Sequence, residues 1–227
     1  MKGISIKSQE EIELMREAGR ILAITHEEMR KALKPGMTTY DIDKLGEEVI
    51  RSYHCEPSFL NYQGYPASVC VSVNDEVVHG IPSKNRVLQD GDIVSLDIVA
   101  KLDGYYGDAA CTFPVGKIEQ KYQDLIDTTR KARDLGIQQA IKGNRLGDIG
   151  HAIQSFCEPK GYSIVRDFCG HGVGFELHED PYVMNYGRKG EGLVIEEGLV
   201  IAIEPMVNMG THKVKIQKDG WTVKTID

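Results

Sequence analysis

Two stretches near the start of the chain have apolar residues every three or four positions, the spacing of an amphipathic helix. Each begins with a capping-box pattern, SQEE at 8–11 and TTYD at 38–41. The spacing predicts one helix that runs until Pro35-Gly36 and a second that continues to Tyr53. Met15 and Tyr53 are expected in the core.

The second half of the chain contains two more helical stretches, one from about 120 to 140 and one that starts near Asp148. Between and after the helices, apolar or alternating runs predict β-strands. These runs are ASVCVSV (67–73), GDIVSLDIVA (91–100), YYGDAACTF (105–113), YSIVRDF (162–168), LVIAIEPMV (199–207), HKVKI (212–216) and WTVKT (221–225). Helices in pairs followed by groups of strands predict an α+β fold with helices on one face of an antiparallel sheet.

The order of these elements repeats at an offset of 107 residues. GMTTYDI at 36–42 aligns with GNRLGDI at 143–149, and DGDIVSLD at 90–97 aligns with EGLVIAIE at 197–204. In the second alignment a carboxylate is expected to end the strand of each half, Asp97 in one and Glu204 in the other. A duplicated helix-helix-strand unit would bring equivalent strand ends together about a pseudo-two-fold axis.

A single catalytic domain over residues 1–227, with halves at about 8–115 and 118–227, agrees with the composition. The chain is 41% hydrophobic and 27% charged, which is typical of a soluble globular protein with a sizeable core. The net charge of −7 argues against a broad nucleic-acid-binding face. Apolar runs such as LVIAI at 199–203 are too short to span a bilayer.

The N-terminus and the cysteines favour a cytoplasmic location. Residues 1–20 are charged throughout and lack the apolar segment of a secretory signal. The five cysteines are odd in number and form no C-x-x-C pair. This pattern argues against a disulfide framework or a structural zinc site and indicates reduced thiols.

Two aspartates are the first candidates for chemistry. Asp97 lies in one apolar run and Asp108 in the next, with the hairpin turn Asp103-Gly104 between them. This turn pairs residue 99 with 108, so the two aspartates become diagonal neighbours on one sheet face, roughly 7–8 Å apart at the backbone. Buried carboxylates repel unless positive charge lies between them. The pattern therefore favours a metal over separate pairing with Lys or Arg or exposure to solvent.

Glu204 and His171 extend this candidate site into the second half. Glu204 ends the run LVIAIE, and the repeat predicts that it faces the place where Asp97 points. His171 lies in GHGVG, whose glycines let the backbone pass close to a crowded site. A lone histidine is more often structural, but beside three carboxylates it is typical of a ligand. Such a donor set suits Mn, Fe(II), Co or Zn, and two ions together can activate a water and polarise a carbonyl.

Five motifs resemble those of bacterial type I methionine aminopeptidases of metallopeptidase family M24. They are VVHGIPS (77–83), GDIVSLD…GYYGDAACTF (91–113), FCGHGVGFELHEDP (168–181), IEPMVN (203–208) and DGWTVKT (219–225). The resemblance covers essentially the whole chain. It implies the pita-bread fold, in which two pseudo-symmetric α+β halves surround a curved antiparallel sheet. It also implies hydrolytic removal of the N-terminal methionine from nascent chains, with a preference for a small second residue.

The resemblance also implies roles for individual residues. The implied metal ligands are Asp97, Asp108, His171 and Glu204. Asp108 would bridge two divalent ions, and Glu204 would also help to deprotonate the attacking water. His79 and His178 would contact the scissile amide and stabilise the tetrahedral intermediate.

An apolar pocket for the methionine side chain is implied as well. Its expected lining is Tyr62, Tyr65, Cys70 and Trp221, with Phe59 and Leu177 nearby. Soft and aromatic surfaces suit a thioether, although without the resemblance these residues would be assigned to ordinary packing. The implied partners are nascent polypeptide N-termini near the ribosome. A monomer is expected, with no membrane or direct nucleic-acid site.

The family pattern departs from this sequence at one place. In the family, the DGWTVKT segment precedes a last strand that bears a second bridging glutamate, whereas this sequence stops at Asp227. Four of the five family ligands are present, so a weakened dimetal site is expected. A shortened sequence is favoured over a naturally shorter relative that has lost activity. Two alternatives stay open: a pita-bread binding module that has lost catalysis, and a prolidase or aminopeptidase P. The short N-terminal region and the expected pocket argue against the second.

Overall fold

The computed structural model describes residues 3–227, and the chain divides into two compact units. The first unit comprises Glu13–Gln123 and Lys215–Lys224. The second unit comprises the described residues up to Ile12, together with Asp124–Val214 and Thr225–Asp227. The expectation of one catalytic domain stays a prediction. Within residues 3–227, no helix combines the length and the apolar character needed to cross a membrane.

The first two helices are α1 (Gln9–Ala32) and α2 (Thr39–Ser52), both close to their predicted bounds. The amide of Ser8 donates to Glu11 Oε2 at 2.7 Å, and the amide of Glu11 donates to Ser8 Oγ at 3.2 Å. These reciprocal bonds form the predicted capping box, and Thr38 makes the second one with Asp41. They satisfy amides that have no partner within the helix.

Long antiparallel pairing characterises the first unit. The strands are β1 (Glu56–Pro57), β2 (Val69–Val73), β4 (Ile93–Leu102) and β5 (Tyr105–Pro114), with β4 between β1 and β2 and also paired with β5. A second sheet, ordered β10-β11-β3, contains β3 (Glu76–Val78), β10 (Val214–Ile216) and β11 (Val223–Thr225). A short 3₁₀ turn, η1 (Tyr62–Gly64), precedes β2.

The β4–β5 hairpin has the register that its turn predicts. Leu102 pairs with Tyr105, and Val99 pairs with Asp108. Asp103 and Gly104 have φ values of 49° and 91°, the conformation of a type I′ turn, whose twist matches that of the strands. The turn alone therefore determines which residues of the two strands face each other.

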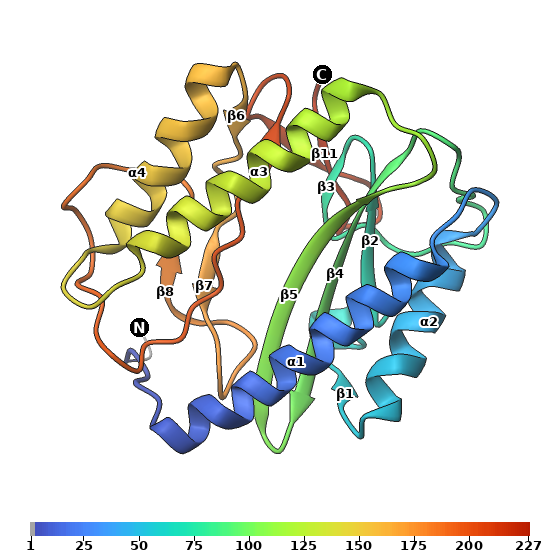
Figure 1. The fold of residues 1–227 in the computed structure, drawn as a ribbon. Coiled ribbons are helices and arrows are strands. Elements are labelled where there is room, and N and C mark those ends of the chain that lie inside the picture. Colours follow the sequence, from blue (N-terminus) through green and yellow to red (C-terminus); the bar gives the residue numbers. More distant parts are fainter. Residues whose placement is uncertain (1–2) are drawn as a thin grey trace. The chain divides into compact units, whose positions relative to one another are not determined.

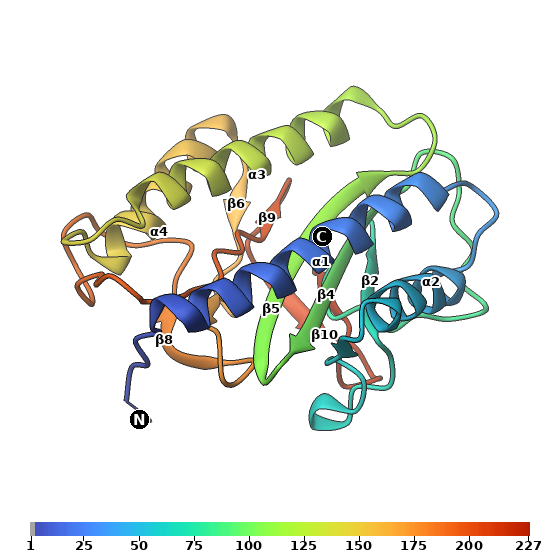
Figure 2. The same cartoon turned by 60° about the horizontal axis from the view of Figure 1, so that its bottom comes forward.

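The core of the first unit lies between α1, α2 and one face of this sheet (Figures 1 and 2). Alternate residues of β4, among them Val94, Leu96 and Ile98, are completely buried on that face. Leu22 and Ile50 from the two helices pack into the same cluster. This confirms an antiparallel sheet with its helices on one face, and it leaves the opposite face of β4 for polar residues.

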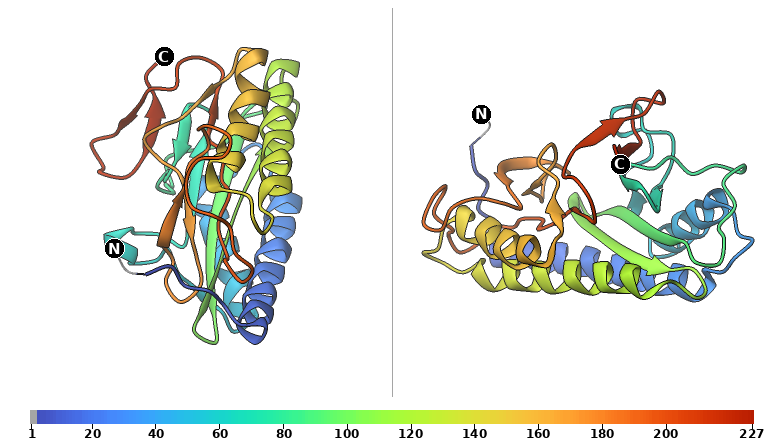
Figure 3. Two further views of the ribbon diagram at one scale, coloured as in Figure 1. Left: turned by 90° about the vertical axis from the view of Figure 1, so that its left-hand side faces the viewer. Right: turned by 90° about the horizontal axis from the view of Figure 1, so that it is seen from above.

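The second unit has paired helices but much shorter strands. Its helices are α3 (Gln120–Gln139, whose first residues belong to the first unit) and α4 (Leu146–Cys157), which is followed by the 3₁₀ turn η2 (Glu158–Lys160). Its strands are β6 (Ser163–Ile164) with β9 (Val207–Asn208), and β7 (Gly170–Gly172) with β8 (Glu179–Val183). Helices α3 and α4 lie side by side (Figure 3), and Ala132, Ile149 and Ile153 belong to the core between them.

The backbone contacts confirm the internal repeat. Gly36 donates to Leu88 O at 2.9 Å, and Gly143 donates to Ile195 O at the same distance. Residues 38 and 87 form an isolated bridge, as do residues 145 and 194. Residues 143, 145, 194 and 195 each follow their counterparts 36, 38, 87 and 88 by 107 positions, the offset found in the sequence. The loop before α2 and the loop before α4 are therefore built alike.

The structure corrects three expectations. The run 199–207 is largely non-strand, with one isolated bridge at Ile201 and the short β9 at its end. Pro205 lacks the amide that a ladder needs, so an apolar run here does not become a regular strand. The run 162–168 forms only the two-residue β6. Tyr53 is 38% exposed, because α2 ends one residue before it.

Candidate active site

Asp97 and Asp108 lie on the polar face of the β4–β5 hairpin. Asp97 pairs with Ala110, two residues beyond Asp108, so the two aspartates are diagonal neighbours on one face, as predicted. Both are partly exposed, and Asp97 lies in the middle of β4 rather than at its end. The sequence correctly predicts the shared face but not the position along the strand.

An aromatic cluster lies in the same unit, close to this polar face. Tyr65 makes edge-on ring contacts with Phe59, at a centroid distance of 6.0 Å, and with Trp221, at 5.2 Å. Cys70 on β2 pairs directly with Asp97 on β4. Phe59, Tyr65 and Cys70 are buried, and burial raises the pKa of the Cys70 thiol well above its usual value. Cys70 is thus a neutral, soft side chain beside a carboxylate.

Backbone bonds hold the aromatic cluster in place. The Tyr65 hydroxyl donates to Gly80 O at 2.7 Å, and burial raises the pKa of this phenol, so it stays protonated. Tyr62, in η1, is partly exposed, and its carbonyl accepts from the amide of Tyr65 at 2.9 Å. The structure therefore brings Tyr65, Phe59 and Trp221 together as predicted, with Tyr62 beside them in the chain.

His79 occupies a strained position next to this cluster. Its φ of 59° lies in the left-handed region, which is rare for a residue with a side chain and is often found at functional sites. The neighbouring Gly80 donates to Ser72 Oγ at 3.0 Å and accepts from the amide of Val71 at 2.9 Å. A Cβ at Gly80 would lie 2.3 Å from the carbonyl oxygen of Val71, so only glycine fits. The His79 ring lies 6.2 Å from that of Trp221, and burial lowers its pKa, which favours the neutral imidazole.

In the second unit, His171 and Glu204 form a close pair. His171 Nε2 lies 3.2 Å from Glu204 Oε1, and His171 Nδ1 lies 2.9 Å from the carbonyl oxygen of Gly172. That carbonyl can only accept, so Nδ1 carries a hydrogen, and in the neutral ring the Nε2 lone pair faces the carboxylate. Two such acceptors need a proton or a cation between them. Metal-binding histidines are commonly oriented by this kind of backbone bond, so the pair fits a metal ion.

The glycines around His171 allow close backbone packing. A Cβ at Gly170 would lie 2.2 Å from Ala202 O, and one at Gly172 would lie 2.4 Å from Asp180 O. The His171 carbonyl accepts from the amide of Ala202 at 2.7 Å, which ties β7 to the segment that leads to Glu204. The glycines are needed as predicted, but the neighbours that they accommodate are backbone oxygens.

His178 lies beside His171, with ring centroids 4.2 Å apart. His178 is exposed and Leu177 is 1% exposed, because the turn before β8 directs successive side chains to opposite sides. Asp108, His171 and Glu204 each offer an atom that could bind a metal ion. The assignment of particular residues to catalytic and binding roles stays a prediction.

No sequence pattern indicates the residues that support these candidate ligands and His79. Asn185 is completely buried, and its Nδ2 donates to the carbonyl oxygen of Glu204 at 3.0 Å. Ser72 supports Gly80, and through it His79, in a comparable way. Such bonds join a side chain to a distant backbone group, so no local pattern predicts them.

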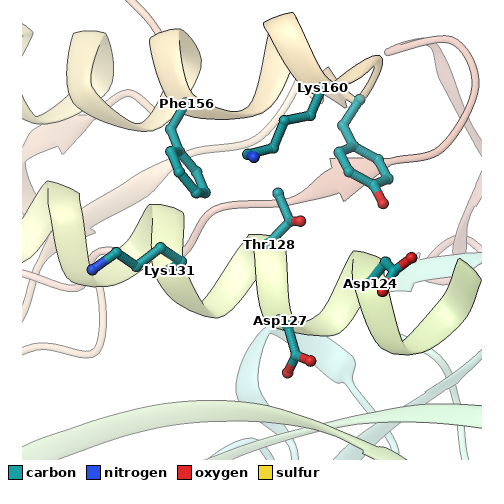
Figure 4. Close-up of a pocket in the computed structure, with 7 residues that line it drawn as sticks. Asp124, Asp127, Thr128, Lys131, Phe156 and Lys160 are labelled. Atoms are coloured by element: carbon teal, nitrogen blue, oxygen red, sulfur yellow. The ribbon is translucent and has the colours of Figure 1, made fainter. Parts of the chain in front are cut away.

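A shallow pocket of about 410 Å³ also lies in the second unit, between α3 and the end of α4 (Figure 4). Its lining residues are Asp124, Asp127, Thr128, Lys131, Phe156, Lys160 and Tyr162. Two aspartates and two lysines contribute opposite charges there, and no candidate site residue takes part. It is therefore separate from the histidines and carboxylates described above.

Comparison with known proteins identifies the family. Residues 13–224 match the model of metallopeptidase family M24. The chain is 53% identical over 224 residues to a methionine aminopeptidase of Clostridium acetobutylicum, covering 99% of this chain and 90% of the relative. It is 50% identical to methionine aminopeptidase 1 of Bacillus subtilis, with the same coverage of both.

Solved structures agree with this result. The methionine aminopeptidase of Rickettsia prowazekii superimposes with a TM-score of 0.96 at 42% identity, covering 99% of this chain and 90% of that one. A prolidase of Pyrococcus horikoshii shares the fold alone, with a TM-score of 0.73 at 23% identity over 88% of this chain and 55% of its own. The predicted α+β pita-bread fold is confirmed. The chain belongs to metallopeptidase family M24 and, within it, to the methionine aminopeptidases.

Proposed function

We propose that this chain removes the N-terminal methionine of peptides and nascent proteins by metal-dependent hydrolysis. The observation that carries the proposal is 53% identity to a methionine aminopeptidase over nearly the whole chain. Membership of a metallopeptidase family establishes the use of a divalent metal. We further propose two ions, drawn from Co, Mn, Fe(II) and Zn.

The proposed ligands are Asp97 and Asp108 of the first unit and His171 and Glu204 of the second. Each pair is supported by its own unit: the aspartates share one face of the hairpin, and His171 Nε2 faces a carboxylate oxygen. When bound, the ions supply Lewis acidity and lower the pKa of a water toward neutrality. The carboxylates balance the positive charge of the ions.

The remaining roles concern protons and orientation. Glu204 is proposed to accept the proton of the attacking water, because its carboxylate is partly exposed while its carbonyl is bonded to Asn185. His79 and His178 are proposed to contact the scissile amide and to stabilise the oxyanion that develops there. The neutral form of His79, favoured by burial, can donate one hydrogen bond and accept another.

Recognition of methionine is proposed to involve the aromatic cluster and Cys70, with Tyr62 and Leu177. Phe59, Tyr65 and Trp221 offer ring edges and faces to a thioether, a contact that sulfur favours. We also propose that the substrates are nascent chains near the ribosome, that a small second residue is preferred, and that the enzyme is a cytoplasmic monomer.

The test is release of free methionine from Met-Ala-Ser by the metal-loaded chain. Chelator treatment should abolish release, and Mn, Fe(II), Co or Zn should restore it. Leu-Ala-Ser and Ala-Pro-Ser are the matched controls, since the first changes only the side chain in the proposed pocket and the second presents the N-terminal Xaa-Pro bond that an aminopeptidase P cleaves. Cleavage of Met-Ala-Ser alone supports the proposal.

Other outcomes distinguish the alternatives. Preferential cleavage of Ala-Pro-Ser would favour an activity of the aminopeptidase P type. A folded chain that binds metal, measured by calorimetry, but cleaves none of the peptides would instead favour a binding module.

A further inference from the structure

A buried ion pair joins the N-terminal segment to the turn that carries His178. Lys7 Nζ donates to Glu179 Oε2, and their side chains are only 1% and 10% exposed. Both residues belong to the second unit. Other Lys or Arg pairs with carboxylates, such as Arg20–Glu17, Lys44–Asp43 and Lys142–Glu197, each have a side chain that is at least 48% exposed.

Glu179 uses its second oxygen to organise the turn before β8. Glu179 Oε1 accepts from the amide of Phe175 at 2.7 Å and from the amide of Glu176 at 3.0 Å. One carboxylate therefore closes the turn of residues 174–179 on itself. His178 lies inside this turn, directly before Glu179 in the chain.

Lys7 is in turn fixed by the backbone around it. Its amide donates to Gly198 O at 2.8 Å, and a Cβ at Gly174 would lie 2.2 Å from Lys7 Cε. Lys7 Nζ also lies 5.5 Å from the centre of the Phe175 ring. The lysine thus fills a space that leaves the ammonium little freedom, and it contacts both ends of the turn.

A buried ion pair is weak evidence for stability alone, because desolvation offsets much of the attraction. Its removal from one side, however, leaves an uncompensated charge that must find water or a new partner. For Glu179 this means that the carboxylate would turn outward and release the two amides. The ion pair therefore favours the one conformation of the turn in which Glu179 accepts from both amides.

We propose that Lys7 is a positioning residue for His178, acting through Glu179 and the turn of residues 174–179. The inference rests on the proposed function only in that it takes His178 to contact the substrate. Lys7 itself touches no substrate. Its loss should leave His178 present but displaced, so that the rate of the chemical step falls more than substrate binding does.

The decisive experiment is a double-mutant cycle between Lys7→Met and His178→Ala, measured as kcat and KM for Met-Ala-Ser. Lys7→Met should lower kcat about 10- to 100-fold, since small misplacement of a catalytic group has such effects, and change KM little. In the His178→Ala background the same substitution should cost about threefold or less, because the two changes act on one step. Equal losses in both backgrounds would overturn the proposal.

Hydrogen exchange tests the same inference without activity. Lys7→Met should speed exchange at the amides of Phe175 and Glu176 and leave α4 unchanged, as judged by exchange in residues 146–157. Unchanged protection of the two amides would overturn the proposal. If the unmutated chain cleaves nothing, the proposed function fails by itself, and the exchange result still decides whether Lys7 orders the turn.

Two further variants keep the result interpretable. Lys142→Met is the matched control, because Lys142 Nζ lies 3.7 Å from Glu197 in the same unit but both side chains are exposed. It should change neither kcat nor exchange in the turn. If Lys7→Met does not fold, Lys7→Met/Glu179→Ala replaces it in both experiments. That variant leaves no unpaired buried charge and removes the acceptor of the two backbone amides, so the same losses of kcat and of protection are expected.

Discussion

The two units position their candidate ligands by different means. In the first, Asp97 and Asp108 occupy two positions of a hairpin whose strands are ten residues long. Asp97 has a paired strand on each side, Asp108 pairs across the hairpin, and these ladder bonds determine where the two residues lie. In the second, His171 lies in a three-residue strand and Glu204 lies outside any strand. Individual bonds such as Asn185 Nδ2 to Glu204 O replace the ladder there.

This difference determines how each unit should respond to mutation. A ladder distributes the positioning of one side chain over many bonds, so a change at the ligand itself should alter chemistry without altering structure. Where single bonds position the ligand, a change at a neighbour should alter both. The first unit should therefore tolerate changes around its ligands better than the second.

The largest effect is expected at Asp108 in the first unit. Asp108→Asn keeps the shape and register of the hairpin but removes a charge that we propose bridges two ions, so kcat/KM should fall about 10³-fold or more. His79→Ala removes one amide contact and should cost about 10²-fold. The melting temperature of Asp108→Asn without metal should not fall. Equal losses for the two variants at saturating metal would contradict the proposed bridge.

A smaller but still large effect is expected at Gly150 of α4 in the second unit. A Cβ there would lie 2.3 Å from Tyr186 O and 2.7 Å from Met184 O, backbone atoms that cannot move aside cheaply. Gly150→Ala should cost about 3 kcal/mol or more of unfolding free energy, as overpacked sites do. Urea unfolding measures it.

Gly19 in α1 is the matched helical control for Gly150. A Cβ there meets no atom within 4 Å. Gly19→Ala should therefore stabilise the protein by about 0.5–1 kcal/mol through helix propensity. If Gly150→Ala and Gly19→Ala changed the unfolding free energy alike, close packing around α4 would not explain why position 150 is a glycine.

Asn185 tests whether one hydrogen bond positions a candidate ligand in the second unit. Asn185→Ala removes the donor to Glu204 O, and a buried acceptor left without it costs about 1–3 kcal/mol. Because the same bond orients the Glu204 segment, kcat should also fall about tenfold. Asn144→Ala, which removes a similar bond to Gln139 O at 3.0 Å, should lower stability without lowering kcat. A loss of stability alone in both variants would remove Asn185 from the positioning of Glu204.

Local patterns in the sequence predict much of the structure around the first two helices and the β4–β5 hairpin. The caps at Ser8 and Thr38 and the turn at Asp103-Gly104 involve residues close together in the chain, and each forms as predicted. The 107-residue repeat likewise predicts the equivalent loops before α2 and α4.

The second unit is harder to predict because its structure depends on distant partners. The run at 199–207 has strand composition but lacks a regular neighbour to pair with, so the apolar pattern overestimates the strand. The contacts of Lys7 with Glu179 and of Asn185 with Glu204 join residues 172 and 19 positions apart. No spacing rule connects such residues, although these contacts position the turn of His178 and the segment of Glu204.

The smallest effect concerns the loss of stability in acid, part of which should come from a buried histidine of the first unit. His26 of α1 is buried, its Nε2 lies 3.0 Å from Leu96 O, and burial lowers its pKa below the usual value near 6.5. Below that pH the unfolded chain binds a proton that the folded chain does not, so the free energy of unfolding falls as pH falls from about 6.5 to the folded pKa. Above about 6.5 both states are neutral and this contribution no longer changes. One such group adds a slope of at most about 1.4 kcal/mol per pH unit. His79, whose pKa burial also lowers, adds a second such contribution.

Urea unfolding of His26→Gln at pH 8 and pH 5.5 should show a smaller difference in unfolding free energy between the two pH values than the unmutated chain does, because glutamine does not titrate. An unchanged difference would mean that His26 is protonated in the folded state as readily as in the unfolded chain. Other titrating groups would then have to cause the loss of stability in acid.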